Sequence, residues 1–132
     1  MKRNPKTLII GANSGIAIEL IKRLQLENHD ISGTYRNLNS DKCSADIQSY
    51  NCDIRHRAQI RNFVDQYSYD QEWDNLIIFP ATMEPIGNFE KISIEKWVES
   101  YEVNFTNQVY MLNKLLPASR RKDSKVLFFA GG

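Results

Sequence analysis

The strongest constraint in this sequence is a glycine-rich segment that stands directly between a strand pattern and a helix pattern. Residues 7–10 form a short apolar run, as buried parallel strands do, and apolar side chains recur on one helical face after the loop. Gly11 lets the chain turn sharply off the strand, and Gly15 removes a Cβ that would block a pyrophosphate. Ala17 is small enough for close helix–sheet packing. Residues 6–37 are therefore predicted to form a dinucleotide-binding strand, glycine-rich loop and helix.

Strand and helix patterns alternate along the rest of the chain, which implies right-handed β-α-β crossovers and a parallel sheet. Further strands are predicted at residues 31–35, 47–52, 76–79 and 126–129, and further helices at residues 56–68 and 94–116, the latter capped by Ser93. Residues 1–132 are thus predicted to be a single α/β domain, a Rossmann-like doubly wound parallel sheet with five strands. The stripe predicted to be buried on the long helix consists of Ile94, Trp97, Val98, Tyr101, Phe105, Val109, Leu112 and Leu116.

Ligands of such sheets sit at the carboxyl ends of the strands, here next to the loops at 11–15, 35–38, 52–54, 79–83 and 130–132. An acidic residue after the second strand would bind the ribose hydroxyls of NAD and repel a 2′-phosphate. This sequence has Tyr35-Arg36-Asn37 at that point. Arg36 can pair with the phosphate and Tyr35 can lie against the adenine side, so the sequence favours NADP over NAD. A solvated loop arginine is the alternative interpretation of Arg36.

These motifs resemble the ordinary, non-extended branch of the short-chain dehydrogenase/reductase family, and the resemblance covers the whole chain. It rests on Gly11-xxx-Gly15-x-Ala17, on Cys52-Asp53-Ile54 after the third strand and on Ala81 in the turn after the fourth. In this family the residue matching Asp53 meets the adenine ring, and the one matching Asn104 is a catalytic asparagine that holds a water in the proton relay. A satisfied polar residue on a helix face is the alternative interpretation of Asn104. Cofactor contacts are expected from Gly11, Asn13, Ser14, Gly15, Ile16, Tyr35, Arg36, Asn37, Cys52, Asp53, Ile54, Pro80 and Ala81.

The sequence also departs from the family pattern in ways that bear on catalysis. Ile10 replaces a threonine whose hydroxyl braces the glycine loop. The catalytic serine should follow the fifth strand, where residues 130–132 read Ala-Gly-Gly, and the family's Tyr-x-x-x-Lys pair belongs after that strand. Tyr110 and Lys114 have this spacing but precede the fifth strand, which favours a chance pairing on a helix surface.

The resemblance implies an NADP-dependent oxidoreductase that transfers hydride between nicotinamide and a carbonyl or alcohol substrate. The catalytic Ser, Tyr and Lys, with further strands and helices, are expected beyond residue 132, so the 132-residue segment alone is expected to be inactive. A non-catalytic dinucleotide-binding module, acting as a sensor or in an assembly, is the alternative. The family often dimerises through its long helix and the next one, which implies a homo-oligomer interface on residues 94–116; core packing explains the same stripe equally well.

Composition argues against several other classes of function. Lys and Arg number 17 against 16 Asp and Glu, so no large field points to a nucleic acid or an acidic membrane surface. No apolar run approaches the roughly 20 residues that span a bilayer, and the N-terminus lacks a signal-peptide pattern. Cys43 and Cys52 form neither a disulfide framework nor a metal-ligand spacing, so no metal site is expected. The sequence predicts a cytoplasmic, reduced protein.

Overall fold

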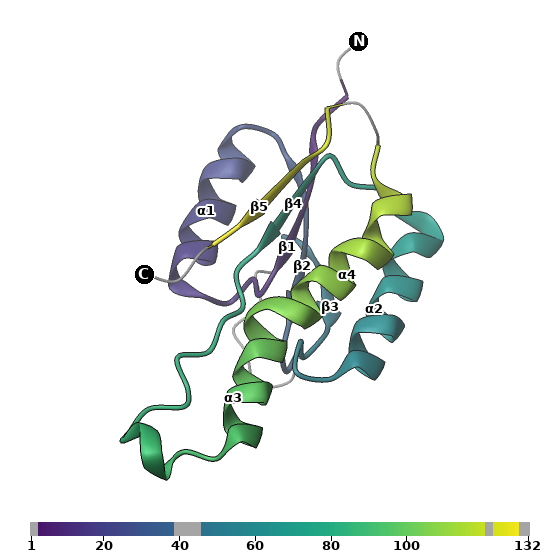
Figure 1. The fold of residues 1–132 in the computed structure, drawn as a ribbon. Coiled ribbons are helices and arrows are strands. Elements are labelled where there is room, and N and C mark those ends of the chain that lie inside the picture. Colours follow the sequence, from purple (N-terminus) through teal and green to yellow (C-terminus); the bar gives the residue numbers. More distant parts are fainter. Residues whose placement is uncertain (1–2, 39–45, 121–122, 130–132) are drawn as a thin grey trace.

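The fold is a five-stranded parallel sheet with helices on both faces, seen in a computed structural model that describes residues 3–38, 46–120 and 123–129 (Figure 1). The strand order is β3-β2-β1-β4-β5, so the direction of winding reverses between β1 and β4. The strands are β1 (Lys6–Ile10), β2 (Asp30–Tyr35), β3 (Gln48–Asn51), β4 (Asn75–Ile78) and β5 (Lys125–Phe128). The helices are α1 (Gly15–Leu26), α2 (Arg57–Asp70), α3 (Ile94–Tyr101) and α4 (Asn107–Leu115). The predicted fold class is confirmed, and every strand lies within one residue of its predicted bounds.

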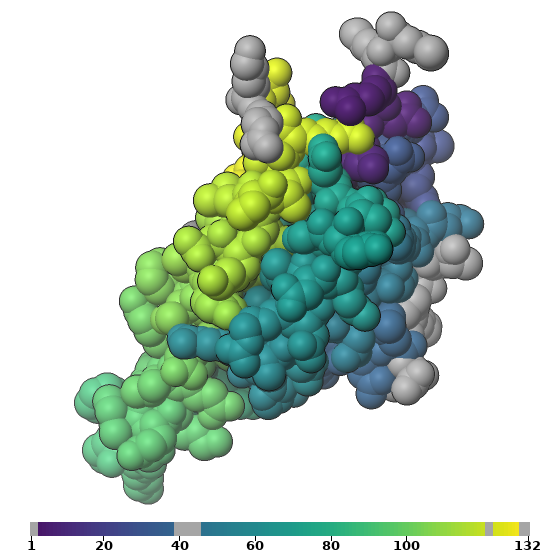
Figure 2. Space-filling view, turned by 90° about the vertical axis from the view of Figure 1, so that its right-hand side faces the viewer, coloured from purple at the N-terminus to yellow at the C-terminus, as the bar shows by residue number. Residues whose placement is uncertain are grey.

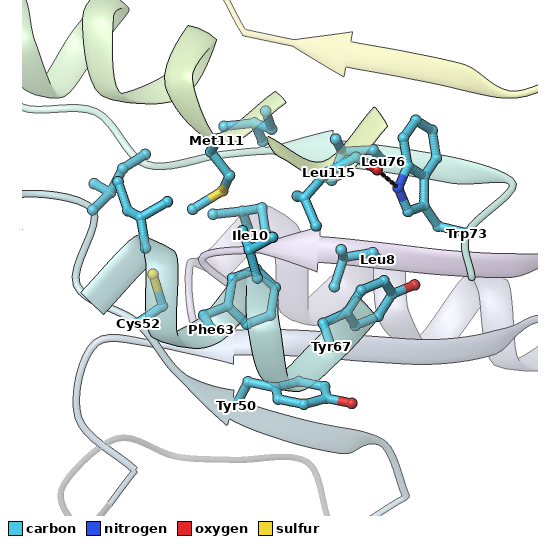
Figure 3. Packing of buried hydrophobic residues seen from close by; sticks show 14 of the residues in the cluster. Leu8, Ile10, Tyr50, Cys52, Phe63, Tyr67, Trp73, Leu76, Met111 and Leu115 are labelled. Atoms are coloured by element: carbon cyan, nitrogen blue, oxygen red, sulfur yellow. Dashed lines mark hydrogen bonds between the residues drawn. The ribbon is translucent and has the colours of Figure 1, made fainter. Parts of the chain in front are cut away.

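Alternation along the central strand divides the core into two layers. Leu8 and Ile10 of β1 face α2 and α4, whereas Ile9 between them belongs to the layer under α1. Figure 3 shows the first layer, where Phe63 of α2 and Met111 of α4 approach the sheet from their two helices. Figure 2 shows α2 and α4 lying side by side over this face. Because helices cover both faces of the central strands, β1 and β4 are buried and mainly apolar, as is typical of parallel strands.

The long helix is continuous but irregular. A π-helical segment, Glu102–Thr106, joins α3 to α4, with helical backbone angles on both sides of it. Ser93 precedes α3 as predicted, but its side chain makes no capping hydrogen bond. No helix in the described part of the chain is long and apolar enough to cross a membrane.

The prediction that the long helix buries its apolar stripe is wrong. Ile94 is 68% exposed, Tyr101 is 60% exposed and Phe105 is 52% exposed. Within the predicted stripe, Leu112 is the residue that packs against the core. The face that meets the sheet and α2 carries Val103, Asn107, Gln108, Met111 and Leu115. Two of these are amides, so apolar periodicity favours the opposite face. A face that contains amides can be buried when the surrounding backbone satisfies their hydrogen bonds, and only the tertiary structure shows that it does.

Candidate functional site

The glycine-rich loop between β1 and α1 has the geometry of a turn that can hold a pyrophosphate. Gly11 has φ +80°, and a Cβ there would lie 3.1 Å from the ring carbons of Pro80. The Ser14 Oγ caps α1 by accepting a hydrogen bond from the N–H of Ala17 at 3.1 Å. A Cβ at Gly15 would meet no atom within 4 Å, so space is open before the helix start. The first turn of α1 holds no acidic residue, which leaves the positive end of the helix to an anion.

Thr34 of β2 braces this loop, a role that the sequence did not indicate. Its Oγ1 accepts a hydrogen bond from the N–H of Gly11 at 3.0 Å, and its carbonyl accepts one from the N–H of Ala12 at 2.8 Å. The family's bracing hydroxyl is missing at Ile10, and the neighbouring strand supplies a hydroxyl instead. Thr34 is 1% exposed, so the brace is fully buried.

One open cavity of about 550 Å³ lies at the carboxyl ends of the strands, between the glycine loop, the loops after β2, β3 and β4, and α3. This is the side of the sheet on which the winding reverses, where ligands of such folds bind. The predicted contact residues that line it are Gly11, Asn13, Ser14, Arg36, Cys52, Asp53, Ile54, Pro80 and Ala81. The predicted contacts that do not line it are Gly15, Ile16, Tyr35 and Asn37.

Tyr35 is placed differently from the prediction. Its side chain is 1% exposed and packs in the core layer under α1, rather than along the cavity where an adenine would lie. The next residue, Arg36, is exposed and lines the cavity. Strand alternation explains the difference, because adjacent side chains leave a strand on opposite faces. Among the described residues that follow β2, up to residue 38, Arg36 is the basic group, and Tyr35 is a core residue.

Asp53 holds the loop after β3 together through its partner Arg55. The guanidinium donates from Nε to Asp53 Oδ1 at 3.0 Å and from Nη2 to Oδ2 at 2.7 Å, and the Arg55 N–H donates to Oδ1 at 3.0 Å. Burial raises the pKa of Asp53, but the hydrogen bonds and charge of Arg55 outweigh this and hold it below its usual value. Cys52 beside it is buried, and burial followed by the charge of Asp53 raises the pKa of its thiol to about 12.

Three amide side chains of the long helix tie down the loops that border the cavity. Asn104 accepts from the N–H of Thr82 at 2.8 Å and donates to the Thr82 carbonyl at 3.0 Å. Asn107 donates to the carbonyl of Ile54 at 2.8 Å, and Gln108 donates to the carbonyl of Pro80 at 2.7 Å. The spacing i, i+3, i+4 places the three amides on one side of the helix. The same spacing of Asn, Asn and Gln is visible in the sequence and could have identified Asn107 and Gln108.

Several residues that line the cavity were not predicted. They are Arg55, Phe79, Thr82, Glu84, Pro85, Lys96, Glu99, Ser100 and Val103. Most come from the loop after β4 and from α3, which approach the sheet only through the tertiary fold. Tyr110 and Lys114 do not line the cavity; the Lys114 ammonium lies 5.7 Å from the centre of the Tyr110 ring. The loop predicted at residues 130–132, the position of the missing serine, lies outside the described residues.

The residues present fit the phosphates of a dinucleotide. Gly11 permits the tight turn, the open space at Gly15 admits a pyrophosphate, and α1 directs its amino end there. Arg36 adds a positive charge on the β2 side of the same cavity. The carboxylate of Asp53, which the family places against adenine, already accepts three N–H groups from Arg55.

Comparisons with known proteins agree with this fold. The structure resembles a Caenorhabditis elegans protein assigned as the carbonyl reductase Sniffer, with TM-score 0.84, 18% identity, and 99% of this chain and 65% of that chain covered. It also resembles a Burkholderia multivorans protein assigned as a short-chain dehydrogenase/reductase with bound NADP (TM-score 0.82, 17% identity, 97% and 59% covered). A third neighbour is aldohexose dehydrogenase of Thermoplasma acidophilum in ligand-free form (TM-score 0.78, 20% identity, 96% and 49% covered). These identities establish the fold alone, and the chain spans 49% to 65% of the length of these three structures.

Sequence comparison goes further than the fold. No curated protein is significantly similar to this chain. The model of the short chain dehydrogenase family, however, matches residues 6–130, which is nearly the whole sequence. With its glycine loop, parallel sheet and cavity at the strand ends, the chain belongs to the short-chain dehydrogenase family.

Proposed function

We propose that this chain binds NADP and forms the cofactor-binding part of an oxidoreductase that acts on a carbonyl or alcohol. NADP is proposed rather than NAD because Arg36 lines the cavity at the end of β2, where an enzyme specific for NAD has an acidic residue. The pyrophosphate is bound by the amino end of α1 and the glycine loop. The Burkholderia neighbour, a protein of the same fold, carries NADP.

The chain's own residues supply binding and orientation, and the nicotinamide of the bound cofactor supplies the hydride. Arg36 pairs with the 2′-phosphate. The hydroxyl of Thr34 holds the glycine loop in place beside the ring of Pro80. The amide of Asn104 holds the backbone of Thr82 at the rim of the cavity. In this proposal the proton relay of Asn104 depends on that positioning, because both polar atoms of its side chain contact Thr82.

Proton transfer to the substrate is assigned to a Ser, Tyr and Lys carried by sequence beyond residue 132. This assignment rests on the family pattern, in which these residues follow the fifth strand. The 132-residue chain is then expected to bind NADPH without reducing a carbonyl substrate. Steady oxidation of NADPH by this chain alone would contradict the assignment, whereas binding without turnover supports it.

The cofactor choice is tested by titrating NADPH and NADH against the wild type and Arg36→Ala. A hydrogen-bonded charge pair contributes about 1.5–3 kcal/mol, so wild type should prefer NADPH by about 10- to 150-fold. Arg36→Ala should remove this preference by weakening NADPH binding and leave NADH affinity unchanged. Arg23→Ala, which removes an exposed arginine far along α1, is the matched control and should keep the preference. Equal affinity of wild type for both cofactors would remove the basis for NADP.

We also propose that the exposed apolar stripe of α3 and α4 is a surface for self-association. Trp97, Tyr101, Phe105 and Val109 are each between 39% and 60% exposed on this stripe, and monomers rarely expose large contiguous apolar patches. Sedimentation velocity should show a dimer for wild type and a monomer for Tyr101→Glu. A wild type that stays monomeric at every accessible concentration would contradict this proposal.

A further inference from the structure

Asn107 and Gln108 are buried polar residues in a position that packing alone would fill with apolar side chains. Asn107 is 2% exposed and Gln108 is 6% exposed, on the face where Met111 and Leu115 enter the core. Burial of an amide disfavours folding unless its hydrogen bonds are replaced, so two adjacent buried amides indicate a task that apolar residues could not perform. The partners of these amides show what the task is.

Asn107 holds the turn between β3 and α2 at two points. Its Nδ2 donates to the carbonyl of Ile54 at 2.8 Å, and its Oδ1 accepts from Nε of Arg57 at 3.0 Å. Ile54 and its neighbour Asp53 line the cavity. The Arg57 guanidinium, at the start of α2, also lies 5.7 Å from the centre of the Tyr110 ring, a second contact with the long helix. Asn107 thus sets the distance of the β3 loop from the long helix.

Gln108 holds the opposite loop. Its Nε2 donates to the carbonyl of Pro80 at 2.7 Å and to the carbonyl of Val103 at 3.2 Å. Pro80 contacts the glycine loop, since a Cβ at Gly11 would lie 3.1 Å from its ring. Pro80 and Val103 both line the cavity. Gln108 therefore sets the position of the loop after β4 relative to the same helical turn.

The strand order separates these two loops along a bound dinucleotide. With a pyrophosphate at the amino end of α1 and a 2′-phosphate at Arg36, the adenosine half of a dinucleotide would extend over β2 and β3. The nicotinamide half would then lie on the other side of β1, over β4. The β3 loop held by Asn107 borders the first half, and the β4 loop held by Gln108 borders the second.

We propose that Asn107 and Gln108 are positioning residues that divide the site between them, Asn107 for the adenosine half of the cofactor and Gln108 for the nicotinamide half. This inference rests on the proposed binding of NADP. If the role of the two amides were purely structural, loss of either should affect all ligands alike, because both are buried on the helix face that also carries Met111 and Leu115. Selective effects on the two halves would not follow from a general loss of stability.

The experiment compares NADPH with 2′,5′-ADP, which carries the adenosine, the 2′-phosphate and no nicotinamide. Binding of both ligands is measured by calorimetry for wild type, Asn107→Ala, Gln108→Ala and the control Asn113→Ala, an exposed residue of the same helix. Asn107→Ala should weaken both ligands by about tenfold, because the β3 loop loses its hydrogen bonds to the long helix. Gln108→Ala should weaken NADPH by about tenfold and leave 2′,5′-ADP unchanged, and Asn113→Ala should change neither.

The variants Asn107→Leu and Gln108→Met keep most of the side-chain volume, add no charge and remove the N–H donor to Ile54, or to Pro80 and Val103. They should reproduce the same pattern if the alanine variants fold poorly. Equal loss of both ligands in both sets of variants, or no loss in either, would overturn the division of roles. If wild type binds neither ligand, the proposed function itself is wrong, and that result differs from either of the others.

Discussion

Substitution of Gly33 by alanine should destabilise the fold from the centre of the sheet, although the added group is a single methyl. A Cβ at Gly33 would lie 2.7 Å from the Cβ of Ala12 and 3.0 Å from Cδ1 of Ile47. Ala12 cannot yield easily, because its N–H is bound to the carbonyl of Thr34 at 2.8 Å, one residue from the new methyl. Overpacking of this kind costs about 1–3 kcal/mol, so the free energy of unfolding should fall by that amount. The loop should also shift and weaken NADPH binding.

Gly15→Ala is the matched control, since the same methyl is added at a glycine where it has room. A Cβ at Gly15 meets no atom within 4 Å, and the residue begins α1, where alanine is favoured over glycine by up to about 1 kcal/mol. This variant should be as stable as wild type or slightly more stable, yet bind NADPH at least about tenfold more weakly, because the methyl enters the pyrophosphate space.

Urea unfolding followed by tryptophan fluorescence gives both free energies, and calorimetry gives both NADPH affinities. A loss of less than about 0.5 kcal/mol in Gly33→Ala, the range of an ordinary surface substitution, would contradict overpacking at this position. Wild-type NADPH affinity in Gly15→Ala would contradict a pyrophosphate site at the start of α1. A loss of stability in Gly15→Ala would show that the space before α1 is not open.

Three further predictions follow from single side chains. Trp73→Phe removes the indole N–H that donates to the Leu115 carbonyl at 2.9 Å (Figure 3). The free energy of unfolding, measured by chemical denaturation, should fall by about 1–3 kcal/mol. An unchanged denaturation midpoint would contradict this. In a Cys43→Ser background, Cys52 should react with a thiol reagent at pH 8 only after the protein unfolds. A thiol pKa of about 12 leaves about one Cys52 side chain in ten thousand ionised at this pH. Rapid labelling of the native protein would contradict the burial of Cys52. In the folded state the pKa of Asp53 lies below its usual value, so the ionised carboxylate stabilises the fold above about pH 4. This stabilisation is lost as the pH falls through the lowered pKa. The difference in unfolding free energy between wild type and Asp53→Asn should therefore shrink below pH 4, and a constant difference from pH 6 to pH 3 would contradict it.

Local chemistry was sufficient to predict the strands and the glycine loop. Residues 8–10 are apolar without interruption, which is the pattern of a strand buried on both faces, and Gly11 follows at the point where the chain must turn. Arg36, Asp53 and Pro80 could be placed at the ligand edge because the carboxyl ends of parallel strands share one edge. These inferences depend on periodicity and order along the chain, which a sequence contains.

The structure alone decided which side of an element faces inward and what satisfies its polar groups. Tyr35 and Arg36 are adjacent, yet one enters the core and the other the cavity, because strand alternation separates them. The long helix buries Asn107 and Gln108 in place of its most apolar stripe, since backbone carbonyls of two distant loops receive their N–H groups. Thr34 replaces the missing hydroxyl of Ile10 from a neighbouring strand. Sequence determines which elements form, because their patterns are local; tertiary structure determines their partners, because these hydrogen bonds join residues more than 20 positions apart.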